Sequence, residues 1–324
     1  MIVITGAAGF IGSCMVRHLN ESGRDDLVLV DDFPVMHAET CHDSSLHREG
    51  VSLQEFRYLE KIPCDFFFDW AAQNIPHIDF IFHFGMETVG MQADEAMLRE
   101  YNLEFSQRLW SLAAMNRIPL LFVASSVDTT WRLLSLNGKL AVERRKIGEQ
   151  YKLMFDNWVL KQRITPPLWA GFSMPEVYGP NETHLSAAAS SVFQLFRQWQ
   201  KEGRMVIPLY ENSEGSDNEP IQDRIFVKDV VTVFTWFKNH LPASGFYYLG
   251  PGYPRPLSAV AAAIFSALKL PPQVEFQIIS SADIHLSQEN NTLPLNRINC
   301  IGYKKNFTPL EKGVRLYVKN ILNE

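Results

Sequence analysis

The stretch MIVITGAAGFIGSCMVRHL (residues 1–19) decides the fold of this chain. It opens with an apolar, β-branched run over residues 2–5, as expected for a strand that is buried on both faces of a parallel sheet. Three glycines spaced G-x-x-G-x-x-G follow, and then a helical pattern through Val16 and Leu19. Glycines here let the chain turn tightly, so that N–H groups at the helix N-terminus approach a pyrophosphate. We therefore predict a dinucleotide site that includes Gly6, Gly9, Phe10, Ile11 and Gly12.

A second predicted strand, DLVLVDDF (residues 26–33), ends in two adjacent acids, Asp31 and Asp32. An acidic residue about 20 positions after the glycines is where the ribose diol of a bound dinucleotide is held. A glycine-rich turn followed by an acidic loop is the plain alternative, but the strand–turn–helix context favours the cofactor site. Two carboxylates repel a 2′-phosphate, and FPVMHAETC (residues 33–41) offers no Lys or Arg to neutralise one. We therefore expect NAD rather than NADP.

The rest of the chain alternates apolar runs with amphipathic segments, which predicts an α/β protein. This alternation is typical of a doubly wound parallel (Rossmann) sheet with right-handed crossovers. We expect residues 1–168 to form the cofactor domain and residues 169–324 to form a smaller substrate lobe whose segments interleave with it. Strands are predicted at 78–85, 118–126, 246–252 and 273–279, and helices at 94–116, 138–163, 187–203 and 257–270.

Composition narrows the class of protein. The net charge is −6 and no Lys/Arg-rich run occurs, which argues against nucleic acid as a partner. Four cysteines lie far apart in no metal-binding spacing, so we expect no metal site and reduced thiols in a cytoplasmic protein. No apolar run approaches the roughly 20 residues of a membrane span, so we expect no membrane partner.

Several motifs carry a resemblance to a known family, namely TGAAGFIGS, VDDF, FIFHFG, VASS, WAGF, VYGPNETH and FVKDVV. With these motifs the chain resembles, from end to end, the extended short-chain dehydrogenase/reductase superfamily, and within it the ADP-glyceromanno-heptose 6-epimerases. The resemblance implies an enzyme that takes a hydride from a sugar carbon onto tightly held NAD and returns it to the other face. It implies a nucleotide-diphosphate sugar such as ADP-heptose as substrate. It also implies a homo-oligomer that pairs through the helices at 94–116 and 138–163.

The resemblance assigns roles to individual residues. The catalytic serine and lysine of the family match Ser126 and Lys152, and Lys152 also holds the nicotinamide ribose. Taken alone, Ser126 fits a residue that merely caps a strand end equally well, and Lys152 fits an ordinary solvated helix lysine. The two catalytic roles therefore depend on the cofactor motifs that surround these residues. The other contacts implied are cofactor contacts for Phe84, Gly85 and Asn102, and substrate contacts for Glu176, His184 and Arg224.

The catalytic tyrosine that the resemblance implies is missing. Its chemistry needs a phenol one helical turn before the lysine, because residues i and i+4 share a helix face and the ammonium lowers the pKa of the phenol. Gly148 stands at that position, and none of the ten tyrosines has a lysine four residues later. Tyr151 is the nearby phenol that remains as a candidate base, but on a helix it points about 100° away from its neighbour Lys152. We therefore expect that Tyr151 does not face the nicotinamide.

Other departures affect the substrate side. The lysine expected after the histidine of GPxExH is Leu185, which removes the second base. Glu176 stands where the family has an asparagine, and an acid there would repel a diphosphate. The arginine expected before DF is displaced by two positions, because the chain has Gln222, Asp223 and then Arg224. Each lost acid–base group costs roughly 10²–10⁴-fold in rate, so we expect weak or absent epimerase activity with NAD binding kept.

Alternatives to a weak or inactive epimerase stay open on the sequence. An active nucleotide-sugar enzyme with a rearranged acid–base set would use Tyr151, His184 or Glu176. A dehydratase or reductase of the same fold would use Asp128 or Glu149. A silent partner that modulates an active paralogue by hetero-oligomerisation would need no base at all.

Overall fold

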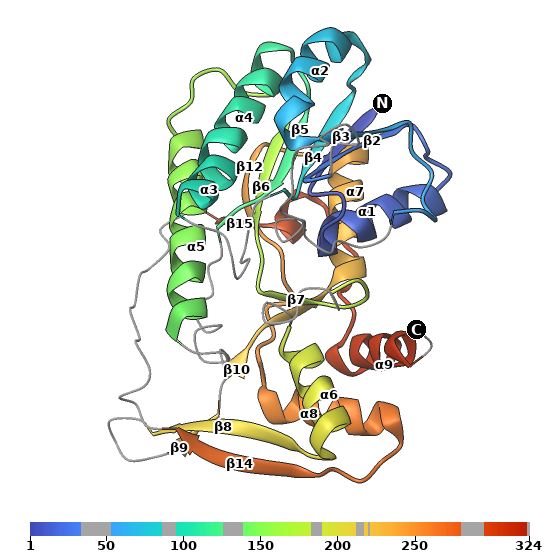
Figure 1. The fold of residues 1–324 in the computed structure, drawn as a ribbon, viewed down its shortest axis with the longest axis vertical. Helices are drawn as coiled ribbons and strands as arrows, with labels where there is room; N and C mark the ends of the chain where they lie inside the picture. The colour runs from blue at the N-terminus through green and yellow to red at the C-terminus, as the bar shows by residue number, and fades with distance from the viewer. Residues whose placement is uncertain are drawn as a thin grey trace, which may run out of the picture.

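The structure, a computed structural model, describes residues 1–33, 53–85, 95–125, 139–182, 190–211, 217–219, 221–279 and 295–322. At its centre lies an eight-stranded sheet with the order β15-β12-β6-β5-β4-β1-β2-β3 (Figure 1). Neighbouring strands all pair in parallel, which confirms the predicted doubly wound sheet. The strands are β1 (Ile2–Thr5), β2 (Leu27–Asp31), β3 (Glu60–Pro63), β4 (Phe80–His83), β5 (Leu120–Val123), β6 (Trp169–Ser173), β12 (Gly245–Tyr248) and β15 (Leu295–Arg297).

Helices cover both faces of this sheet (Figure 1). They include α1 (Phe10–Glu21), α2 (Phe67–Asn74), α4 (Ser106–Met115), α5 (Lys139–Val159) and α7 (Val227–His240). Side chains alternate across a strand, so Ile2 and Ile4 of β1 join one core cluster while Val3 joins another. The first cluster packs α1 and α7 against the sheet, and the second packs α2, α4 and α5. Burial on both faces explains why the strands read as continuous apolar runs.

The helix predicted at 94–116 is not regular. It begins as α3 (Glu95–Arg99), continues as a π-helical segment η3 (Glu100–Phe105), and ends as α4. A π-helical turn widens the helix and shifts the side chains that follow, and such turns are often found at functional sites. Asn102 lies inside this segment and is fully buried against α5. The prediction of one amphipathic helix was therefore wrong in its middle.

The C-terminal part of the chain builds a smaller lobe and also completes the main sheet. The lobe has its own apolar core, in which α6, α8 and α9 pack with Met205 and Ile207 of β8. Strands β6, β12 and β15 and helix α7 return to the main sheet, so the two parts are interleaved. The remaining elements are α6 (Ser191–Glu202), α8 (Leu257–Leu268), α9 (Leu310–Ile321), η1 (Cys64–Phe66), η2 (Ile75–His77), η7 (Ile298–Ile301), β7 (Glu176–Tyr178), β8 (Met205–Glu211), β9 (Asp217–Asn218), β10 (Ile221–Gln222), β11 (Arg224–Phe226), β13 (Arg255–Pro256) and β14 (Val274–Ile279).

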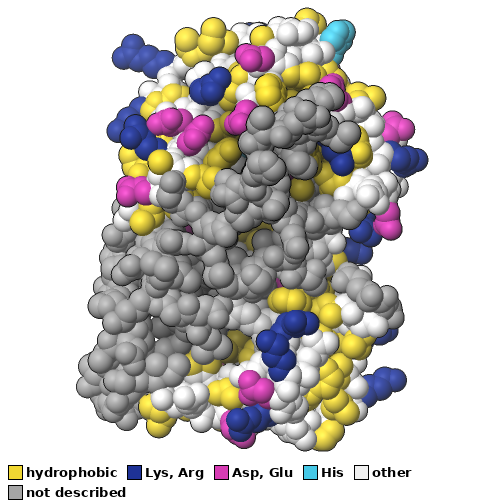
Figure 2. Space-filling model, viewed as in Figure 1, with side chains coloured by type: hydrophobic (Ala, Val, Ile, Leu, Met, Phe, Trp, Pro, Cys, Tyr) yellow, Lys and Arg dark blue, Asp and Glu magenta, His cyan; other side chains and the backbone are white. Residues whose placement is uncertain are grey.

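On the face shown in Figure 2, the described surface has no large patch of side chains of one charge sign. Basic and acidic side chains are interspersed there with apolar ones. Among the helices in the described ranges, none combines the length and the apolar character that crossing a bilayer requires.

Gly171→Ala should destabilise the fold by overpacking β6. A Cβ on Gly171 would lie 2.6 Å from ring carbons of Phe246 and 2.8 Å from the Phe122 ring. Both rings are fully buried, so neither has open space into which it can move, and the expected loss in free energy of unfolding is about 1–3 kcal/mol. Urea denaturation measures this loss. Phe246→Leu makes room, so the double variant should lose less than the sum of the two single losses. A wild-type midpoint for Gly171→Ala would contradict this packing.

Candidate functional site

The glycine turn after β1 is held by backbone contacts that exclude any Cβ. Gly6 has φ +67°, and a Cβ on it would lie 2.6 Å from the amide nitrogen of Gly85 after β4. A Cβ on Gly12 would overlap the carbonyl oxygen of Gly6. The amide of Gly9 donates to that carbonyl at 3.1 Å, which closes the turn. The three glycines thus bring α1 down onto the carboxyl ends of the central strands.

The start of α1 is suited to an anion. Its N-cap is Gly9, and within this described helix the cap makes no side-chain hydrogen bond and the first turn holds no acid. The first N–H groups of a helix lack intrahelical acceptors and carry the positive end of the helix dipole. Phe10 is buried and Ile11 packs against the core, so these two residues offer backbone rather than side chains to a ligand.

Asp31 has a structural contact that the sequence did not predict. Its Oδ2 accepts a hydrogen bond from the amide of Ala8 at 2.7 Å, and its Oδ1 accepts from the amide of Asp32 at 2.8 Å. The carboxylate therefore lies directly beside the glycine turn, at the end of β2. Asp32 is exposed.

Phe84 and Gly85 continue β4 and pass beside the glycine turn. The amide of Phe84 donates to the carbonyl of Thr5 at 3.0 Å, and the amide of Gly85 donates to Thr5 Oγ1 at 3.3 Å. The Phe84 ring packs on Phe234 with ring centres 4.9 Å apart, so it faces the core. The part of this loop that meets Gly6 is therefore backbone.

Helix α5 presents Lys152 and Tyr151 in different directions. Lys152 is 2% exposed, and its Nζ donates to Glu149 Oε1 at 3.1 Å. The Tyr151 hydroxyl instead donates to Glu95 Oε1 on α3 at 3.0 Å, near the surface. Desolvation and Glu95 raise the pKa of Tyr151, whereas a phenol that acts as a base needs a lowered pKa. In this structure the two neighbours do not serve one site.

Gly148, where the resemblance implies a phenol, lies against Asn102. Gly148 is buried, and its carbonyl accepts a hydrogen bond from Asn102 Nδ2 at 3.2 Å. The resemblance placed Asn102 beside the cofactor. The structure adds that its side chain joins the π-helical segment to α5 one turn before Lys152.

Two buried titratable residues near Lys152 were not predicted from the sequence. His83 bridges Thr5 Oγ1 at 2.6 Å and Ser106 Oγ at 2.9 Å, and burial, with a smaller effect of Lys152, lowers its pKa to about 3. Asp156 accepts from the amide of Ser125 at 2.7 Å, and burial raises its pKa to about 7. Asp156 stands four residues after Lys152, and this i, i+4 spacing was a usable signal.

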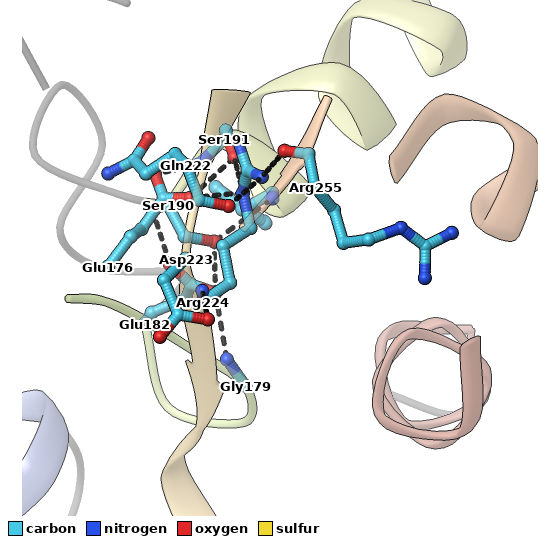
Figure 3. Close-up of polar contacts among 10 residues, drawn as sticks. Glu176, Gly179, Glu182, Ser190, Ser191, Gln222, Asp223, Arg224 and Arg255 are labelled. Atoms are coloured by element: carbon cyan, nitrogen blue, oxygen red, sulfur yellow. Dashed lines mark hydrogen bonds and ion pairs between the residues drawn. The ribbon is translucent and has the colours of Figure 1, made fainter. Parts of the chain in front are cut away.

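On the substrate side, Glu176 and Arg224 form a buried ion pair (Figure 3). Arg224 Nε donates to Glu176 Oε2 at 2.7 Å, and the Arg224 side chain is 2% exposed. Ser191 donates to both carboxylate oxygens, through its amide at 2.7 Å and its hydroxyl at 2.6 Å. Glu176 is therefore not the isolated negative charge that the sequence suggested, because Arg224 neutralises it.

The same cluster contains two further carboxyls that the sequence reasoning missed. Glu182 is fully buried and accepts from the amide of Gly179 at 3.0 Å and from the amide and hydroxyl of Ser190 at 2.6 and 2.8 Å. Burial raises its pKa to about 7. Asp223 accepts from the Tyr248 hydroxyl and from the amide of Gly252, both at 2.7 Å. Glu182 is the glutamate of the GPxExH motif and Asp223 precedes Arg224, but the sequence did not show that these two carboxyls are buried.

Some predicted positions lie outside the described residues. Ser126 and His184 are among them, as are Leu185 and Asp128. Within the described ranges no group of three or more His, Cys, Asp or Glu side chains is placed to hold a metal ion.

Comparison with known proteins identifies the family. A model described as the NAD dependent epimerase/dehydratase family matches residues 2–250. The chain belongs to this family. An ADP-L-glycero-D-manno-heptose-6-epimerase from Fusobacterium nucleatum is 28% identical, with 99% of this chain and 98% of the relative covered. A protein of the same name from Nitratidesulfovibrio vulgaris is also 28% identical, with the same two shares covered.

Solved structures of the NAD-dependent epimerase/dehydratase type share the fold. The Helicobacter pylori ADP-L-glycero-D-manno-heptose-6-epimerase matches with a TM-score of 0.66 at 19% identity, covering 99% of this chain and 96% of that one. A dTDP-glucose 4,6-dehydratase from Bacillus anthracis, solved in complex with NAD, matches with a TM-score of 0.65 at 14% identity and the same coverage.

The glycine turn of this family member fits NAD. An uncapped helix start, backbone without Cβ atoms at Gly6 and Gly12, and the Asp31 carboxylate meet at one edge of the sheet. Pyrophosphate and ribose diol are the groups that such N–H donors and such an acid bind.

Asp156→Asn should stabilise the protein relative to wild type as the pH rises. The folded-state pKa of Asp156, about 7, lies above the ordinary aspartate value. The carboxyl therefore stabilises the fold at low pH and loses that contribution as the pH rises through 7. Asparagine keeps an acceptor for the Ser125 amide and does not ionise. Urea denaturation at pH 5 and pH 8 measures the free energy of unfolding of the variant minus that of the wild type. This difference should be about 1–3 kcal/mol larger at pH 8 than at pH 5.

The matched control for Asp156→Asn is Asp69→Asn on α2, where the side chain is exposed. Its free energy of unfolding relative to wild type, measured at the same two pH values, gives the baseline. A change with pH that is no larger for Asp156→Asn than for this control would show that the pKa of the buried carboxyl is not raised.

Proposed function

We propose that this protein binds NAD in preference to NADP and has little or no epimerase activity towards ADP-heptose. One observation carries the proposal. The helix face that should present a phenol one turn before Lys152 presents Gly148, while Tyr151 is hydrogen bonded to Glu95 at 3.0 Å. A cofactor site without its proton-transfer group binds a dinucleotide and turns over substrate slowly.

The cofactor half supports binding. Amides at the start of α1 would hold the pyrophosphate, and Asp31 would accept hydrogen bonds from the adenosine ribose. Lys152 would hold the nicotinamide ribose from α5, since its ammonium is buried beside the sheet end. When bound, NAD supplies a hydride acceptor. The 2′-phosphate of NADP would meet two adjacent acids, Asp31 and Asp32, at the end of β2.

The catalytic half supports slow turnover. General acid–base catalysis by one group is worth roughly 10²–10⁴-fold, and two such groups are replaced, by Gly148 and Leu185. On the substrate side the charge of Arg224 is directed to Glu176 rather than into an anion site. These changes affect substrate chemistry and leave the glycine turn intact.

A second candidate function is favoured by the ion pair on α5. Glu149 contacts Lys152 at 3.1 Å and stands next to Gly148, so a carboxylate lies close to the place of the missing phenol. A dehydratase or reductase that uses Glu149 for proton transfer fits this arrangement.

We also propose a cytoplasmic oligomer that forms through α4 and α5, either with a second copy or with an active paralogue. The side chain of Met154 on α5 is 52% exposed, and that of Met115 at the end of α4 is 77% exposed. A groove between α2, α4 and α5 is lined by Phe68, Arg108 and Trp158 among others. Apolar exposure of this kind is typical of contact surfaces.

Two substitutions of Asp31 should separate its structural role from its ribose role. Asp31→Ala removes the acceptor of the Ala8 amide and of the ribose, and should weaken NAD binding by about 1–3 kcal/mol. Asp31→Asn keeps an acceptor for Ala8 but loses the charge, so it should narrow the gap between NAD and NADP. Tryptophan fluorescence titrations with both cofactors measure this, with Asp69→Asn, exposed on α2, as the control. Equal or tighter NADP binding by the wild type would refute the proposed preference.

The unmodified protein should show little turnover of ADP-heptose in the presence of NAD. Gly148→Tyr places a hydroxyl one turn before Lys152, yet alone it should restore little activity because Leu185 moves no proton. The double variant with Gly148→Tyr and Leu185→Lys should gain more epimerase activity than the two single variants combined, since groups that serve one transition state act as a unit. The assay is epimerisation followed by separation of the two heptose epimers.

Glu176 is left unchanged in these variants. Its removal would leave Arg224 buried without a counter-charge, at a cost of about 3–5 kcal/mol in stability. Robust turnover by the unmodified protein would defeat the proposal. A double variant that binds ADP-heptose but stays inert would show that the substrate differs.

A further inference from the structure

Strand β14 forms an open edge of the small sheet in the C-terminal lobe. The sheet has the order β14-β8-β9, so β8 pairs with one side of β14, and no strand in the described ranges pairs with the other side. The strand runs along the outer rim of the lobe (Figure 1). Proteins usually protect such an edge with Lys, Pro or a bulge. The strand VEFQII (residues 274–279) contains neither Lys nor Pro, and its unbroken register with β8 leaves no bulge.

The open edge also exposes large apolar side chains. Val274, Phe276 and Ile278 share one face of the sheet, because side chains alternate along a strand. Val274 packs against the core that α6, α8 and α9 form. Phe276 is 55% exposed and Ile278 is 60% exposed. An edge strand that is both unprotected and apolar is a template for pairing with another chain.

The backbone register shows which residues point to the open edge. The amide of Met205 on β8 donates to the carbonyl of Gln273 at 2.9 Å, and Met205 lies opposite Val274. The N–H and C=O of one residue point to the same edge of a strand, and successive residues alternate between the two edges. Gln273 therefore points to β8. It follows that Val274, Phe276 and Ile278 present both backbone groups to the open edge.

A second β14 in the antiparallel direction complements this edge. When the Phe276 residues of the two copies lie opposite each other, Val274 of each copy lies opposite Ile278 of the other. All three outward residues then form pairs that exchange two hydrogen bonds each. The same register places apolar side chains opposite apolar ones, which stabilises a sheet. Any other antiparallel register leaves at least one of the three residues unmatched within the strand.

The charges of the strand also fit a second copy. Glu275 is the charged residue of β14, and its carboxylate contacts Arg204 Nη1 at 2.5 Å. With the Phe276 residues opposite each other, Glu275 lies opposite Gln277 of the second copy. The Gln277 amide is neutral and offers a donor to the carboxylate. Like charges therefore do not meet across the pair.

We propose that β14 pairs with β14 of a second copy of this chain, antiparallel and with a twofold axis at Phe276. The contact uses the same residues on both copies, so it closes at a dimer. Because a strand pair buries little surface, we expect a weak dimer of micromolar affinity. This surface is separate from the one on α4 and α5. It also involves neither the glycine turn nor the cluster of Figure 3.

Cysteine cross-linking tests both the contact and its register. Opposite residues in a hydrogen-bonded antiparallel pair have Cα atoms about 5.5 Å apart, which a disulfide spans. Phe276→Cys should therefore cross-link two copies under mild oxidation with copper phenanthroline. Ile278→Cys is the matched control, because its side chain is equally exposed but lies about 14 Å from the same position in the second copy. Phe276→Cys should react at least about tenfold faster, with the native cysteines of the wild type giving the background.

Sedimentation equilibrium measures the dimer without a cross-link. Phe276→Lys places two ammonium groups opposite each other and should raise the dissociation constant of the dimer at least about tenfold. Leu59→Lys is the control, since Leu59 is 62% exposed and precedes β3 outside the lobe. Met154→Lys changes the surface on α5, and it should leave the cross-linking of Phe276→Cys unchanged. Thermal melts check that each variant is folded.

Several outcomes would overturn this dimer. Equal cross-linking of Phe276→Cys and Ile278→Cys would show random collisions rather than a fixed register. A wild type that stays monomeric up to about 100 μM, without cross-linking of Phe276→Cys, would show that β14 does not pair with itself. A wild-type dimer that Phe276→Lys leaves intact and Met154→Lys abolishes would assign the contact to α5. The cofactor titrations judge the proposed function separately, because β14 takes no part in them.

Discussion

The contact between the glycine turn and the end of β4 is the constraint on which the cofactor side depends. At Gly6 the backbone comes so close to Gly85 that any Cβ would lie 2.6 Å from its amide nitrogen. This approach brings the uncapped start of α1 over the sheet edge, and Asp31 then fixes the turn through the amide of Ala8. Because the contact is made by backbone, it survives side-chain changes elsewhere in the cleft. Side-chain substitutions in the cleft therefore leave the shape of this turn unchanged.

How far the sequence predicted this structure depended on the range of the interactions involved. The first strand, turn and helix were predictable because each rests on residues that lie close together in the chain. The contact between the π-helical segment and α5 was not, because it joins Asn102 to the carbonyl of Gly148, 46 positions away. The pairing of Glu176 with Arg224 joins residues 48 positions apart. A sequence shows that both charges exist, whereas only the fold shows that one neutralises the other.

Helix α5 is joined to the rest of the fold by buried polar residues. Burying Lys152 is unfavourable unless its charge is compensated, and Glu149 supplies a carboxylate one turn away. Four residues further on, Asp156 holds the amide of Ser125 at the end of β5. These polar residues join the helix to the sheet independently of any phenol. The support of the helix therefore does not depend on a side chain at Gly148.

The two sides of the cleft are constrained by different kinds of interaction. Family membership therefore supports the cofactor and the substrate to different degrees. Backbone contacts at Gly6 and Gly12 tolerate no side chain, so relatives at 28% identity can be expected to keep the same cofactor turn. A buried charge pair tolerates exchange when both partners change together, because each neutralises the other. Glu176 and Arg224 are such a pair, and the neighbouring Gln222 is uncharged. Family membership therefore supports NAD far better than it supports ADP-heptose.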